Sequence, residues 1–403
     1  MTAFATMHMQ CGSFLERQRR FEKDDGASNC QTLYGIDRIP GDGTVRTLLD
    51  PVPPSLLSPA FDAGLEVLRA AGGLSRFEVL GGRHAITFDG TQYHCSDKVK
   101  CPKCSHRTKT VKRGDEKQTV TEHFHTAVVP MVVRPGLTKV LPLPAEFVTP
   151  QDGHGKQDCE MVATRRWFAA HGARYLHLRP VMLGDDLYSN HPMLTAVKAA
   201  KWDFVVVAKP DSHKTLYEYV DGAIDMPVAK ERFKQGKTWR IITCRWLKSV
   251  PVRGGGDALE VNWLDMTVTD EKTGKVVHRN SFVTSLDVDA SNVVDIATVG
   301  RTRWKTENEG FNTLKNLGYA FEHNFGHGSD NLSSVLASLN LLAFLFHTVC
   351  ALTWDRWAVV VDKYRSNGRL VVRIAHAAEL TVFTSWEELL DVLGKKVRLV
   401  IAG

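Results

Sequence analysis

The chain has 403 residues, enough for two or three domains that each bury a core. Apolar residues make up 43% and charged residues 24%, which is ordinary for a globular protein and excludes a disordered or low-complexity chain. The net charge of +6 is modest but unevenly spread, and its clusters of basic residues favour phosphate groups as partners.

Residues 1–75 are predicted to form a small helical N-terminal region. Its first residues, "MTAFATMHMQ", lack the basic start and apolar run of a signal peptide, so we expect a cytoplasmic protein with its eight cysteines reduced. A short helix from Thr44 to Leu49 follows a Pro/Gly turn and ends before Pro51. Such a helix can enter a DNA groove, although an ordinary surface helix explains it more simply.

Residues 76–215 predict a mixed sheet flanked by helices. "RHAITFDGTQYHC" reads as a strand, a tight Asp-Gly turn and a second strand, and two more strand-like runs surround Pro135-Gly136. Strand, helix and strand then follow in "LHLRPVML", "NHPMLTAVKAAKW" and "DFVVVAKP". We therefore expect an α/β fold in which a βαβ unit joins an antiparallel meander.

Residues 216–295 read as an all-β insertion, and residues 296–360 as a return to the first sheet. The run from Val335 to Trp354 is long enough to cross a membrane, but Ser338, Asn340 and His347 interrupt it, which favours a buried core helix and no membrane. Residues 361–403 form a C-terminal segment with a helix that Ser385 and Glu388 cap.

Three carboxylates stand at positions from which they could meet. Asp185 directly follows an apolar strand, and Asp89 ends the strand "AITF". Glu307 shares a helical stripe with Arg303, Phe311 and Leu314, if residues 301–316 form a regular helix. A polar loop at Asp185 and a hairpin turn at Asp89 are the alternative explanations. Asp186 and Glu309 should point elsewhere, because adjacent strand residues diverge and the two glutamates lie on different helical faces.

Three such carboxylates can hold two divalent cations about 4 Å apart, one beside the attacking water and one beside the leaving oxygen of a phosphodiester. Hard oxygen ligands suit Mg²⁺ or Mn²⁺. Arg303 and Lys315 could hold phosphate oxygens beside that pair of ions.

Three stretches of the sequence, "AITFDGTQY", "VMLGDDLYSNHP" and "RTRWKTENEGFNTLKNLGYAFEHNFGHG", resemble insertion-sequence DDE transposases. The likeness covers roughly residues 80–350 and is to the group with a ribonuclease H-like core and a β-rich insertion before the catalytic glutamate. It implies Asp89, Asp185 and Glu307 as the catalytic carboxylates, double-stranded DNA as element end and as target, a homodimer assembled on DNA, and a place on the bacterial nucleoid.

On the helix that carries the third carboxylate, the family signature runs Tyr, two residues, Arg, three residues, Glu, six residues, Lys. Arg303 and Glu307 fit it. Gly300 stands at the Tyr position and Leu314 at the Lys position, with Lys315 one step later, and Thr306 replaces the usual apolar residue before the glutamate.

The stretch "HCSDKVKCPKCSHRTKTVKR" combines cysteines with cations. Cys101 and Cys104 have zinc-ligand spacing, and further ligands would come from Cys95, His106 or the more distant His123. A basic loop with reduced cysteines is the simpler interpretation. "EHFH" and "EHNFGHG" also contain possible ligands, although hydrogen-bonded structural histidines explain them more simply. Seven cations without an intervening acid predict contacts with DNA phosphates: Lys98, Lys100, Lys103, Arg107, Lys109, Lys112 and Arg113.

The sequence therefore predicts a transposase that cuts its element's ends and joins the 3′-OH groups to target DNA. Two alternatives stay open: a catalytically inactive DNA-binding descendant of such an element, and a metal-dependent nuclease without strand transfer. Paired inverted repeats beside the gene would discriminate the first alternative, and the reaction products would discriminate the second.

Overall fold

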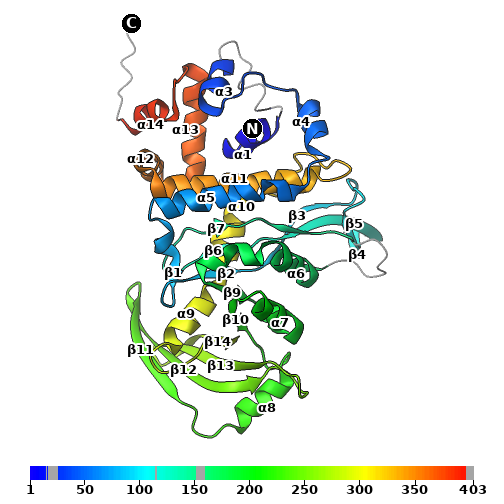
Figure 1. Ribbon diagram of the computed structural model, residues 1–403. Coiled ribbons are helices and arrows are strands. Elements are labelled where there is room, and N and C mark those ends of the chain that lie inside the picture. The colour runs from blue at the N-terminus through cyan, green and yellow to red at the C-terminus, as the bar shows by residue number, and fades with distance from the viewer. Residues whose placement is uncertain (15, 17–25, 114–115, 151–158, 396–403) are drawn as a thin grey trace.

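The computed structural model describes residues 1–14, 16, 26–113, 116–150 and 159–395, and it has a mixed α/β fold (Figure 1). One large mixed sheet has the strand order β11-β12-β13-β14-β10-β9-β2-β6-β7, with β1 beside β2. Its strands are β1 (Glu78–Val79), β2 (Arg83–Thr87), β6 (Met131–Val133), β7 (Leu141–Pro142), β9 (Pro180–Gly184), β10 (Asp203–Val207), β11 (Val228–Gln235), β12 (Thr238–Pro251), β13 (Glu260–Asp270) and β14 (Val276–Thr284).

The centre of this sheet contains the predicted βαβ unit and part of the predicted meander. Strands β2, β6 and β7 form an antiparallel meander, while β9 lies parallel to both β2 and β10. Helix α6 (Glu160–His171) and the 3₁₀ turn η3 (Gly172–Leu178) lead into β9, and α7 (His191–Ala199) connects β9 to β10. Because the central strands are covered on both faces, they read as continuous apolar runs such as "VML" and "FVVV".

The predicted β insertion does not form a sheet of its own. It opens with a helix, α8 (Lys214–Gly222), and its four strands extend the main sheet, because β14 pairs with β10 over Val205–Val207. Helix α9 (Val293–Arg301) then crosses back over strands β10 to β14. The chain thus leaves the sheet after β10 and returns beside the same strand.

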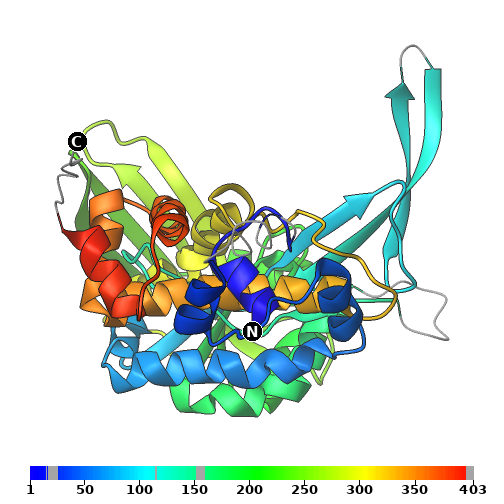
Figure 2. The same ribbon diagram turned by 90° about the horizontal axis from the view of Figure 1, so that it is seen from above.

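A second sheet contains β3 (Gly90–Ser96), β4 (Ser105–Arg113), β5 (Glu116–Val128) and β8 (Glu146–Val148). The predicted Asp89-Gly90 hairpin is wrong, because β2 pairs within the main sheet whereas β3 pairs with β5. Asp89 therefore lies where the chain passes from one sheet to the other. Strands β4 and β5 form a long ribbon, and Figure 2 shows its paired residues 105–113 and 116–124 projecting from the body; we call these residues the arm.

Two long helices separate the sheets from a layer of terminal helices (Figure 1). Helix α11 (Leu332–Thr353) packs against α5 (Ser58–Ala70), the first helix α1 (Thr2–His8) and strand β7. Within the described residues, α11 is the one helix long and apolar enough to cross a membrane, and 78% of its most apolar window is buried inside the protein. The prediction of a core helix is confirmed.

The N-terminal and C-terminal regions, predicted as separate, share one small core. Asn29 donates hydrogen bonds to the carbonyls of Ala378 and Thr381, and Trp386 donates one to Leu33. Ser385 caps the last helix as predicted. The helices of this layer are α1, α3 (Gly26–Tyr34), α4 (Asp42–Leu49), α12 (Asp355–Tyr364), α13 (Asn367–Leu380) and α14 (Trp386–Gly394), with the turns η1 (Pro54–Leu57) and η2 (Leu74–Phe77) leading on to the sheet.

Candidate functional site

Two of the predicted carboxylates follow neighbouring parallel strands. Asp89 comes two residues after β2 and Asp185 directly after β9, and the Phe88 amide donates to the Leu183 carbonyl at 2.9 Å. This is the edge at which open α/β sheets form their sites. Glu307 belongs to a different segment. Arg303 lies between Asp89 and Glu307 and pairs with both. Its Nη1 is 2.8 Å from Glu307 Oε1 and 3.3 Å from Asp89 Oδ2.

A fourth carboxylate, Glu160, joins this group without having been predicted. It opens α6, and its carboxylate packs so closely on Gly90 that a Cβ there would overlap it. Burial is the main cause that raises the pKa of Asp89 to about 7. Arg303 opposes that rise, while Glu160, Glu307 and Asp185 add to it. Burial and Asp185 also raise the pKa of Glu160. The group is therefore short of positive charge. A glutamate in the first turn of a helix is common, so its sequence carried no signal of this role.

The neighbouring acids point elsewhere, as predicted. Asp186 accepts hydrogen bonds from the Lys209 amide at 2.6 Å and from the Ser212 hydroxyl, which ties it to the loop after β10. Glu309 faces Lys305 at 3.8 Å. Only one member of each acidic pair is directed at the group around Asp89.

The segment that carries Glu307 is not the regular helix that the sequence predicted. It passes from the 3₁₀ turn η5 (Thr302–Trp304) through a π-helical stretch η6 (Thr306–Phe311) to α10 (Asn312–Asn316). The Thr306 hydroxyl shares a hydrogen bond with the Thr87 hydroxyl of β2, so this departure from the family pattern has a buried partner. π-Helical turns occur often at functional sites.

Two other departures have structural consequences. A Cβ at Gly300 would lie 2.7 Å from Val205 Cγ1 and 2.9 Å from Phe282 Cε1, so a Tyr side chain does not fit in this packing. Lys315 forms an ion pair with Glu322 at 2.8 Å and, among the described residues, has no ion pair with Asp89, Asp185 or Glu307. The structure therefore brings Asp89, Asp185, Glu307 and Arg303 together and engages Lys315 with another acid.

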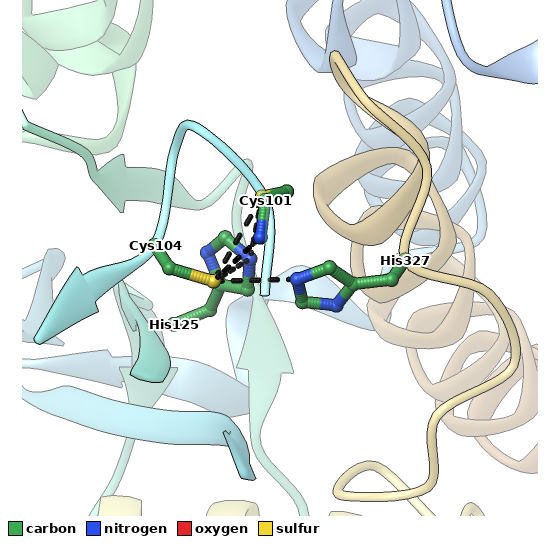
Figure 3. A group of neighbouring side chains, drawn as sticks. All are labelled: Cys101, Cys104, His125 and His327. Atoms are coloured by element: carbon green, nitrogen blue, oxygen red, sulfur yellow. Dashed lines mark hydrogen bonds between the residues drawn. The ribbon is translucent and has the colours of Figure 1, made fainter. Parts of the chain in front are cut away.

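Cysteines and histidines form the second group of candidate ligands (Figure 3). The Nε2 atom of His125 lies 3.4 Å from both Cys101 Sγ and Cys104 Sγ, and the Nε2 atom of His327 lies 3.3 Å from Cys104 Sγ. The two sulfurs are 3.8 Å apart. All four donor atoms lie within 4.8 Å of one another, so this cluster can hold a metal ion. Among the described residues, no other set of three or more Cys, His, Asp or Glu side chains gathers its donor atoms so closely.

The predicted ligands Cys95 and His106 are not part of this cluster. Cys95 is exposed, because it and the buried His94 project from opposite faces of β3. His106 lies on the exposed arm beside His123, with ring centroids 6.4 Å apart. His125 and His327 take their places. Both histidines were recognised as possible ligands within "EHFH" and "EHNFGHG", but the sequence did not indicate that these segments lie beside Cys101 and Cys104.

The cluster is largely withdrawn from water. Burial lowers the pKa of His125 to about 3 and that of His327 to about 4, and it raises the pKa of the Cys104 thiol to about 11. Both imidazoles are therefore neutral at neutral pH and present a lone pair. The Cys101 amide also donates to Cys104 Sγ at 3.4 Å.

The basic stretch is partly neutralised by an acid from the opposite strand. Glu122 of β5 accepts from Arg107 at 2.9 Å and also pairs with Lys109, so the expectation of a stretch without a compensating acid is wrong. The two cations lower the pKa of Glu122 through these hydrogen bonds. Lys103 donates to Asn331 at 2.7 Å. Lys98, Lys100 and Lys112 are exposed, and the Arg113 side chain lies outside the described residues.

The sequence matches no protein-family model, and no curated protein matches it significantly.

Proposed function

We propose that this protein is a DDE-type DNA transposase with a ribonuclease H-like core. The observation that carries the proposal is the convergence of Asp89 and Asp185, from the ends of adjacent parallel strands, with Glu307 from a distant segment. The meander joined to a βαβ unit supports it, because the resemblance implies a sheet of this kind.

The donor set fits divalent cations such as Mg²⁺ or Mn²⁺. Asp89, Asp185 and Glu307 offer hard oxygen ligands. The pKa of Asp89 is raised mainly by burial and further by the neighbouring carboxylates, and added positive charge would stabilise its ionised form. When bound, such ions lower the pKa of a water molecule and stabilise the leaving oxygen of a phosphodiester. Glu160 stands close enough to add a fourth carboxylate to their surroundings.

Arg303 can act in two ways at this position. Without cations its guanidinium neutralises Asp89 and Glu307. Once cations engaged the carboxylates, the same guanidinium would be available to donate two parallel hydrogen bonds to two oxygens of a phosphate. Lys315 is not placed to hold phosphate in the same way, because it forms an ion pair with Glu322.

The remaining parts of the proposal are carried by the resemblance and by charge. Double-stranded DNA is the partner, through the exposed lysines around the arm, and a homodimer on DNA would cut both element ends in the bacterial nucleoid. A structural Zn²⁺ belongs to the proposal as well, at Cys101, Cys104, His125 and His327 instead of the predicted ligands.

The test is incubation of the full chain with a DNA fragment that carries the element's own end, with and without Mg²⁺. The proposal expects Mg²⁺-dependent cleavage that leaves a 3′-OH, followed by joining to a second DNA. Cleavage without joining would indicate the nuclease alternative. Binding without cleavage by a fully folded chain would indicate the inactive DNA-binding alternative.

A further inference from the structure

The Cys/His cluster joins three parts of the chain, one of which is far from the other two in sequence. Cys101 and Cys104 lie in the turn between β3 and β4, immediately before the arm, and His125 lies on β5 just past the arm's paired residues. His327 comes from the segment between α10 and α11, 223 residues after Cys104. Figure 3 shows the imidazole of His327 approaching the cysteine sulfur from the side opposite the turn.

Four of the six separations between the donor atoms match the edges of a zinc tetrahedron, and all six lie within 4.8 Å. With Zn–S near 2.3 Å and Zn–N near 2.0–2.1 Å, tetrahedral geometry requires S···S of about 3.8 Å and S···N of about 3.5 Å. The measured separations are 3.8 Å between the sulfurs and 3.3–3.4 Å between sulfur and nitrogen. A disulfide needs sulfurs about 2.05 Å apart, so the same pair is placed for a shared metal and not for a bond.

When a metal displaces the cysteine protons, two thiolates and two neutral imidazoles form a soft donor set that selects Zn²⁺ over Mg²⁺. A set of four protein ligands leaves no open position, which is the composition of a structural and not a catalytic zinc site. The nearby His94 has its Nε2 atom 3.4 Å from the Val99 carbonyl and therefore has another partner.

We propose that the cluster binds one Zn²⁺ that clamps the base of the arm to the segment before α11. That segment is anchored on its other side by Asp50, whose carboxylate accepts hydrogen bonds from the amides of residues 329–332 at 2.9–3.1 Å. Lys103 reaches Asn331 across the same junction, and the Tyr93 and Phe321 rings meet beside it at 5.8 Å.

The clamp fixes the direction of the arm relative to the rest of the molecule. The arm meets the body at one end only, so its orientation depends on the contacts at its base (Figure 2). A metal bond between that base and the chain that leads from Glu307 to α11 holds the arm's exposed cations at a set position from the carboxylates. The ion also closes a long chain loop, which stabilises the native state through the unfolded ensemble.

The metal content of the full-length protein tests the site. We expect one zinc per chain by elemental analysis, and Co²⁺ substitution should give the visible absorption of a tetrahedral site with sulfur ligands. Cys101→Ser, Cys104→Ser and His327→Asn should each lose the metal, whereas Cys95→Ser and His106→Asn should retain it as matched controls. A wild-type chain that takes up neither Zn²⁺ nor Co²⁺, a disulfide between Cys101 and Cys104, or metal loss in the control variants would overturn the proposal.

Limited proteolysis tests the clamp without DNA. Removal of the ion with a chelator should make residues 97–104 and 317–331 several-fold more rapidly cleaved, and Zn²⁺ but not Mg²⁺ should restore protection. Strands β9 and β10 should stay protected throughout, which excludes general unfolding. If the protein loses zinc and its cleavage pattern does not change, the clamp is wrong. Because no readout involves DNA, failure here and failure of the transposase proposal are distinguishable.

Discussion

The carboxylate group around Asp89 and the Cys/His cluster around Cys104 differ in how far their geometry is set before a metal arrives. The four soft donors already lie within 4.8 Å of one another. Among the carboxylates, the positive charge of Arg303 separates Asp89 from Glu307, and burial with mutual repulsion raises the pKa of Asp89 to about 7.

This is the difference that we expect between the proposed structural zinc site and the proposed catalytic site. A closed site with preset ligands holds its ion permanently and contributes folding energy. In the proposed catalytic site, Arg303 would exchange its carboxylate partners for phosphate when cations and substrate bind, which is what phosphoryl transfer would require. The same protein therefore offers an internal control, since each group can be altered while the other is measured.

The largest expected effect comes from neutralising a carboxylate. Asp89→Asn, Asp185→Asn and Glu307→Gln keep the side-chain shape but remove the charge that offsets a divalent cation, so DNA cleavage should fall about a hundredfold or more while end binding survives. Cleavage assays on the element's end with saturating Mg²⁺ measure this.

Two neighbouring acids serve as controls. Asp186→Asn and Glu309→Gln alter groups that face the loop after β10 and Lys305, so their effect on cleavage should be far milder. All five variants should keep their zinc. If Glu309→Gln abolishes cleavage and Glu307→Gln does not, the assignment of the third carboxylate is wrong.

Acid should destabilise the folded protein through the buried histidine His8. His8 lies among aromatic rings and His347, without sulfur ligands, and burial lowers its pKa from 6.5 to about 4. The unfolded chain then binds the proton more readily, so stability is full above pH 6.5 and declines as the pH falls towards 4. The loss is on the order of 3 kcal/mol.

Urea unfolding between pH 7 and pH 4 checks this. His8→Phe should flatten the pH dependence in that window, because the group that becomes protonated on unfolding is gone. His376→Gln, which alters an exposed histidine of α13, should leave the pH dependence as it is. An unchanged slope in His8→Phe would mean that other groups dominate the acid response.

Gly300 of α9, which precedes the segment that carries Glu307, should matter for stability and for the proposed cleavage but not for zinc binding. Gly300→Ala places a Cβ against Val205 and Phe282 in the core, which should cost about 1–3 kcal/mol and displace the segment that carries Glu307. Gly222→Ala, at the end of α8, meets nothing within 4 Å and should be neutral or slightly stabilising. Equal urea midpoints for the two variants would contradict the packing argument.

The sequence predicted what depends on local periodicity and missed what depends on long-range pairing. Strand patterns sufficed for the βαβ unit and for part of the meander, and the apolar run of α11 indicated a core helix. The prediction of a hairpin at Asp89-Gly90 was wrong because β3 pairs with β5, and the local turn residues do not reveal this pairing. The regular helix predicted over residues 301–316 was wrong, since η5 and η6 interrupt it. Thr306 of η6 bonds to Thr87, a contact more than 200 residues away that local periodicity does not reveal.

The candidate ligands divide in the same way. Asp89 and Asp185 were found because each follows an apolar strand, and Glu307 because it shares the family's spacing with Arg303. Glu160 carries no such mark. Cys101 and Cys104 could be recognised from their spacing. His125 and His327 become candidate ligands only through the pairing of β3 with β5 and the position of the segment before α11.

The smallest effect expected concerns the charge of the arm and its base. Lys98 and Lys100 are exposed and have no ion-pair partner among the described residues, whereas Glu122 engages Arg107 and Lys109. Each phosphate contact contributes about 0.9 to the slope of log K against log salt concentration. Removing both free lysines with Lys98→Ala and Lys100→Ala should therefore flatten the slope by up to about 1.8. Glu122→Gln should steepen it by a similar amount, because it releases two cations.

Fluorescence anisotropy with unrelated DNA duplexes between low and high salt gives both slopes, and binding should shift equally for every sequence, since phosphates carry no base information. Should Glu122→Gln leave the slope unchanged while the lysine variant flattens it, DNA contacts the base of the arm alone, and the projecting ribbon serves another purpose.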